Sequence, residues 1–61
     1  MNVVDEELQK RYAEINRFLD ALAWANECGL KMEFMDSFLQ DYEQTKSIPS
    51  AVWFAECEWD L

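Results

Sequence analysis

The side chains of this 61-residue chain that could carry chemistry are mainly carboxylates. Asp36 and Asp41 lie close together in the sequence, and Glu56, Glu58 and Asp60 form a second group. Paired carboxylates serve as general acid and base in some enzymes, but on a helix surface they are ordinarily solvated. The chain has no histidine, which removes the commonest general base and the commonest imidazole ligand for metals. We therefore interpret both groups as solvated helix faces.

The remaining nucleophiles also lack catalytic surroundings. Cys28 and Cys57 are widely separated and lack the paired spacing of a zinc site or a redox motif. We expect two buried, inert thiols; a disulfide between them is possible in principle, but nothing in the sequence requires one. Gly29 is the single glycine, so the sequence offers neither a calcium loop nor a glycine-rich phosphate loop. The sequence predicts no enzyme, no catalytic residue, no metal site and no cofactor.

Any interaction site must therefore be built by helices, and the first half of the chain shows the clearest helical pattern. An apolar stripe recurs at alternating spacings of four and three residues, which keeps its members on one side of a helix. Its members are Leu8, Tyr12, Ile15, Leu19 and Leu22. We expect this helix to begin near Val4 or Asp5 and to continue to Cys28, where Gly29 can adopt the left-handed conformation that ends a helix.

Two further helices complete the predicted fold. The second, from about Lys31 to Lys46, has one apolar face, and the short connection around Gly29 predicts an antiparallel hairpin with the first helix. That face contains Met35, Phe38, Leu39 and Tyr42. We expect it to cover the apolar stripe of the first helix. The third helix runs from Pro49 to about Trp59; its residues also alternate as in a strand, but an isolated strand has no partner within the chain.

The length of 61 residues allows a single small helical domain covering residues 1–61. A lone chain of this size buries only about 60% of its unfolded surface, so association is one usual source of stability. The sequence also contains nine aromatic residues (three Trp, two Tyr and four Phe), more than one hairpin easily hides. We therefore predict an all-α fold that forms a homodimer.

Two sets of residues are the candidate interaction sites. The candidate self-association residues are Leu8, Tyr12, Ile15, Phe18, Leu19, Leu22 and Trp24. The candidate partner-binding residues are Trp53, Phe54, Glu56, Glu58, Trp59 and Asp60. The simpler alternative for the tryptophans is that they complete the core, whereas the functional interpretation makes the carboxyl-terminal segment an aromatic anchor.

Charge limits the kinds of partner. Thirteen acidic residues against five basic ones give a net charge of −8, which disfavours direct contact with nucleic-acid phosphates. The acidity serves solubility, or it suits a basic protein groove. The apolar runs are too short to span a membrane, and no apolar signal segment begins the chain, so we expect a cytoplasmic protein.

The chain combines short length, acidity, a predicted hairpin and the closing segment SIPSAVWFAECEWDL from Ser47 to Leu61. In these features the whole chain resembles the small early proteins of lambdoid bacteriophages, especially those encoded between the recombination exonuclease and the excisionase genes. The resemblance implies a protein of the bacterial host cytoplasm that binds a host or phage protein and influences host regulation or the choice between lysis and lysogeny. An acidic decoy for a nucleic-acid-binding groove and a dimeric DNA-binding regulator are the alternatives.

Overall fold

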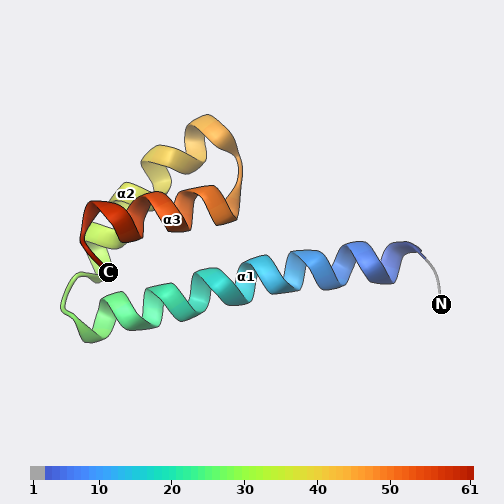
Figure 1. The fold of residues 1–61 in the computed structure, drawn as a ribbon, viewed down its shortest axis with the longest axis horizontal. Helices are drawn as coiled ribbons and strands as arrows, with labels where there is room; N and C mark the ends of the chain where they lie inside the picture. Colours follow the sequence, from blue (N-terminus) through green and yellow to red (C-terminus); the bar gives the residue numbers. More distant parts are fainter. Residues whose placement is uncertain (1–2) are drawn as a thin grey trace.

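The computed structural model describes residues 3–61, and these residues form three helices without any strand. The helices are α1 (Val3–Glu27), α2 (Lys31–Thr45) and α3 (Ile48–Glu58) (Figure 1). The prediction of an all-helical chain with three helices is confirmed. The third segment is a helix and not a strand: Ser47 caps it, Pro49 lies in its first turn, and one face of it is buried within the same chain.

Gly29 ends α1 in the predicted way. Its φ of 75° lies in the left-handed region, and the turn leaves open space around the position where a Cβ would be. The Leu30 amide donates to the Ala25 carbonyl at 2.8 Å, and the Gly29 amide donates to the Asn26 carbonyl at 3.1 Å. These two bonds satisfy carbonyls that the helix end would otherwise leave unpaired. The chain then enters α2 directly.

A polar network fixes the turn between α2 and α3. Ser47 caps α3, since its hydroxyl accepts a hydrogen bond from the Ser50 amide at 3.3 Å. The Ser50 hydroxyl donates to the Asp41 carboxylate at 2.9 Å, and the Thr45 hydroxyl lies 3.3 Å from the same oxygen. Hydrogen bonds from residues of both α2 and α3 therefore fix the turn.

The core lies between all three helices and combines alanines with phenylalanine rings. Its buried apolar residues are Ala21, Ala25, Phe34, Phe38, Ala51, Val52 and Ala55. The small alanines let the helix backbones approach one another, and the rings fill the space between them. Phe18 packs on Phe38 with ring centroids 4.6 Å apart, and Phe38 stacks on Tyr42 at 5.7 Å.

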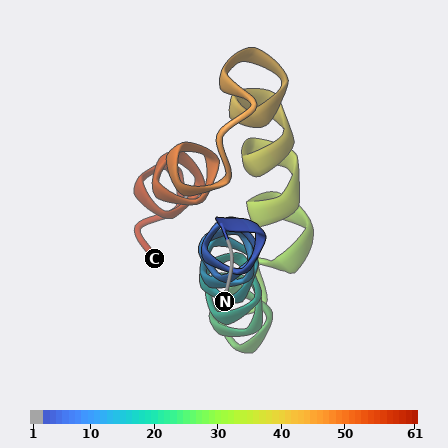
Figure 2. The same ribbon diagram turned by 90° about the vertical axis from the view of Figure 1, so that its right-hand side faces the viewer.

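The three helices are unequally packed. The most extensive contact is between α2 and α3, and α1 contacts each of them less. Figure 2 looks along α1 and shows α2 and α3 on the same side of it, with α2 leaning away. In Figure 1 the α2–α3 pair covers the carboxyl-terminal part of α1, and the amino-terminal part projects beyond it. The connection between α1 and α2 is short, but the two helices diverge from each other away from it.

This arrangement contradicts the predicted cover for the apolar stripe. The face of α1 that packs into the core carries Phe18, Ala21, Leu22 and Ala25, so Leu22 is the one stripe residue that joins it. On α2, Leu39 was expected to pack inward but is 49% exposed. Helix periodicity places residues relative to one another around an axis, but it does not determine which of two neighbouring apolar faces meets the core.

The expectation of two buried thiols is also wrong. Cys28 lies in the turn that closes α1, and Cys57 lies two residues after the buried Ala55, on the outer side of α3. Both cysteines are exposed and free. A rotation of about 100° per residue turns Cys57 away from the core.

Candidate interaction surface

The most prominent feature of the surface is a row of large apolar side chains along α1. We call it the exposed stripe, and it consists of Leu8, Tyr12, Ile15 and Leu19. Their exposed fractions are 47%, 60%, 43% and 51%, respectively. Burying such side chains is worth about 1.5–3 kcal/mol each when it is complete, so leaving four on one helix face forgoes a large apolar contribution. A contiguous apolar surface of this kind is typical of an interaction site.

The structure divides the seven candidate self-association residues into three groups. The exposed stripe supplies four of them. Phe18 and Leu22 pack against the core instead. Trp24 is 52% exposed, but at about 100° per residue it lies about 160° around α1 from Leu8. Trp24 therefore belongs to a different surface from the exposed stripe.

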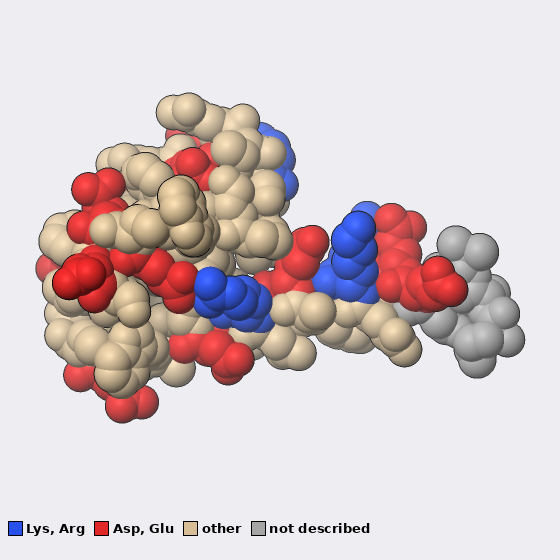
Figure 3. All heavy atoms as spheres, in the orientation of Figure 1, with Lys and Arg blue, Asp and Glu red and all other residues tan. Residues whose placement is uncertain are grey.

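Few charges border the exposed stripe. By helical rotation, Gln9, Asn16 and Ala23 line one edge of it, and Arg11 lies on the other edge. The acidic residues of α1 from residue 6 onward lie about 90° or more from the middle of the stripe. In Figure 3 the charged side chains of the projecting part of α1 gather along its upper edge, and the lower edge is uncharged. In a chain of charge −8, this face is locally apolar and nearly neutral.

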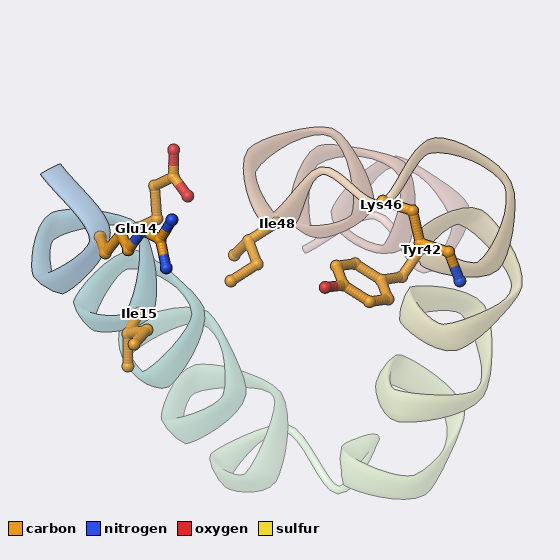
Figure 4. A pocket seen from close by; sticks show the side chains of 6 residues that line it. Glu14, Ile15, Tyr42, Lys46 and Ile48 are labelled. Atoms are coloured by element: carbon orange, nitrogen blue, oxygen red, sulfur yellow. The ribbon is translucent and has the colours of Figure 1, made fainter. Parts of the chain in front are cut away.

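A cleft of about 460 Å³ opens beside the exposed stripe, where α1 and the α2–α3 turn diverge. Its lining residues are Arg11, Glu14, Ile15, Tyr42, Lys46 and Ile48. Figure 4 shows Ile48 and the Tyr42 hydroxyl pointing into the gap toward α1. The Lys46 ammonium lies 5.7 Å from the centre of the Tyr42 ring and points away from the gap. Ile15 belongs to both the cleft and the exposed stripe, so the two features are continuous.

The candidate partner-binding residues do not form one surface. Trp53 points outward from α3 and is 64% exposed, whereas Phe54 is half-buried. Trp59 folds back onto α2, and its Nε1 donates to the hydroxyl of Ser37, a buried polar residue of the core, at 2.9 Å. Glu58 and Asp60 are exposed. Of the three aromatic residues, Trp53 is the most exposed and is therefore the candidate anchor.

Glu56 has a structural partner in α1. Arg17 donates to its two carboxylate oxygens at 2.8 and 3.1 Å, a bidentate arrangement that joins α1 to α3. This hydrogen bond, reinforced by the charges of Glu56 and Asp20 and opposed by desolvation, raises the pKa of Arg17 above its ordinary value. Because this pKa is raised in the folded chain, the contribution from Arg17 is present at neutral pH and is lost as the pH rises into the strongly alkaline range. The pair is half-exposed, so it contributes less than about 1 kcal/mol.

The described residues contain no group of three or more side chains suited to hold a metal ion. Among the helices of residues 3–61, none is long and apolar enough to cross a bilayer. Comparison with known proteins gives no match to a family model, a curated protein or a solved structure. The geometry of the surface is therefore the basis for any functional conclusion.

Proposed function

We propose that this chain is a non-enzymatic interaction protein that forms a homodimer through the exposed stripe and binds a further protein through the outer face of α3. The observation that carries the proposal is the exposure of four large apolar residues in register on one face of α1. This spacing is that of a two-helix seam. The sequence resemblance to small phage early proteins supports a role in modulating host or phage regulation.

The overall dimensions support association. The radius of gyration is 12.7 Å, whereas a compact domain of 61 residues has a radius of about 10.5 Å. The accessible surface is 4683 Å², and a compact monomer of this mass exposes roughly 500 Å² less. The monomer thus leaves surface uncovered that a second chain can bury.

Charge favours a second copy as the occupant of the exposed stripe. Two chains of charge −8 repel each other, so they associate best through a face without acidic residues. From residue 6 onward the exposed stripe meets that condition, because its edges carry Gln9, Asn16, Ala23 and the cationic Arg11. A basic partner would gain little there and would bind better to the acidic surfaces elsewhere. The stripe is therefore assigned to self-association.

The test is the oligomeric state of a variant that places a charge inside the seam. Ile15→Glu should convert the dimer to a monomer at micromolar concentration, because the seam would have to bury a carboxylate in each copy. Met32→Glu is the matched control, since Met32 is 75% exposed and lies outside the stripe. It should remain dimeric in sedimentation velocity. A wild-type chain that sediments as a folded monomer at the same concentration would refute the proposal.

A further inference from the structure

The α2–α3 pair lies over one end of α1 only, and this asymmetry limits the orientations in which two copies can pair through α1. The exposed stripe runs from Leu8 to Leu19, but the α2–α3 pair covers only the carboxyl-terminal part of α1 (Figure 1). The amino-terminal part projects with its apolar residues bare. A second copy has the same shape, so its projecting part can lie beside the covered part of the first.

We infer that the two copies pair through antiparallel α1 helices about a two-fold axis beside Ala13 and Glu14, and that the partner helix borders the cleft at Ile15. The inference rests on the proposed homodimer and specifies its geometry. In this register Leu8 lies level with Leu19 of the partner subunit, and Tyr12 lies level with Ile15 of the partner subunit. The four residues of the exposed stripe thus form four consecutive layers, with none left over.

Charge favours this direction over a parallel pair. Glu6 and Glu7 occupy the first described turns of α1, and both are exposed. A parallel pair would bring these carboxylates from both copies to the same end, whereas an antiparallel pair separates them by most of the length of α1. It also aligns the helix dipoles in opposite directions, which is the favourable arrangement for neighbouring helices. The neutral edge then places Gln9 near Asn16 of the partner subunit, where both amides can form hydrogen bonds.

The position of the cleft along α1 also agrees with the proposed two-fold axis. Arg11, Glu14 and Ile15 line it from α1, so it lies at the same level of the helix as the proposed two-fold axis. Its other wall, made by Tyr42 and Ile48, belongs to the α2–α3 turn (Figure 4). Ile15 is the lining residue that also belongs to the exposed stripe, so a partner helix along the stripe passes the cleft at its Ile15 edge. The second copy therefore borders the cleft at Ile15.

Disulfide trapping distinguishes the two directions. In a Cys28→Ser, Cys57→Ser background, Leu8→Cys and Leu19→Cys chains are prepared separately, and each is oxidised alone and after mixing. Antiparallel pairing predicts that the mixture forms covalent dimers containing one chain of each kind and that neither chain alone does. The original cysteines are both exposed, so their replacement leaves the core intact.

Sedimentation of the same samples before oxidation separates the possible failures. Dimers that become covalent with Leu8→Cys alone would show parallel pairing and overturn this inference while the proposed homodimer stands. Dimers that never become covalent would place the interface elsewhere and also overturn it. A wild-type monomer would overturn both proposals. If the leucine variants fail to associate, Gln9→Cys mixed with Asn16→Cys and joined by a short bismaleimide leaves the stripe intact; absence of cross-linked dimer there counts against the antiparallel geometry.

Discussion

At the scale of single residues, the end of α3 contains a backbone conformation that costs free energy. Asp60 closes α3 with a φ of 57°, a left-handed conformation that glycine adopts far more easily. The Leu61 amide donates to the Glu56 carbonyl at 2.8 Å, and the Trp59 amide donates to the Ala55 carbonyl at 3.2 Å. This is the same type of helix end as at Gly29, but without glycine. Asp60 also places a negative charge at the negative end of the helix dipole.

Replacing Asp60 with glycine should therefore stabilise the protein. Asp60→Gly removes both the strained β-carbon and the unfavourable charge, and we expect the free energy of unfolding to rise by about 0.5–1 kcal/mol. Urea denaturation followed by circular dichroism measures the change. Asp60→Ala is the matched control, because it removes the charge and keeps the β-carbon. Equal stabilisation by both variants would assign the effect to charge alone.

At the scale of helices, α1 and α3 each have one face inside the core and a second apolar feature outside it. In α3 the inner face contains Ala51, Val52 and Ala55, and Trp53 points away from them. Trp53 lies far from Trp59 around the helix, at about 120° by rotation, and Trp59 is held by Ser37. The fold thus separates a structural tryptophan from one that is free to bind a partner.

Trp53→Ala tests the outer face of α3. Since the side chain is 64% exposed, its removal should change the free energy of unfolding by less than about 0.5 kcal/mol. It should also leave the oligomeric state unchanged and abolish capture of any partner that the wild type specifically retains from a bacterial lysate. Met32→Ala is the control for loss of an exposed apolar side chain. Equal capture by wild type and Trp53→Ala would remove Trp53 from the partner-binding surface.

At the scale of the whole molecule, two opposing effects act on the proposed dimer of an elongated chain of charge −8. The exposed stripe gains from burial, and the net charges repel. Because salt screens the repulsion and has little effect on apolar burial, the dimer should become a few-fold tighter between low salt and about 0.5 M salt. Sedimentation equilibrium measures the dissociation constant in each solution.

The same linkage makes thermal stability depend on protein concentration, since the midpoint of unfolding should rise as the dimer is populated. Ile15→Glu should remove that dependence. A dissociation constant that increases steeply with salt would instead indicate that opposite charges hold the chains together, which the neutral borders of the exposed stripe do not predict.

The sequence by itself determined the three helices and the places where they end. The left-handed turn at Gly29 and the break around Pro49 follow from local backbone chemistry, so the expected bounds differ from Val3–Glu27, Lys31–Thr45 and Ile48–Glu58 by only a residue or two. These features depend on neighbours in the chain. They need no knowledge of distant contacts.

Only the tertiary structure decided which apolar face of α1 lies in the core. The face with Ala21 and Ala25 lets α2 and α3 approach closely, and Phe18 fills the remaining space, so the bulkier row from Leu8 to Leu19 stays outside. Periodicity alone cannot determine which of these two faces of α1 is buried, because it does not show how closely another helix can pack against each face. The tertiary contacts also hold Trp59 against α2 through Ser37, at 38% exposure, and leave Trp53 at 64% exposure.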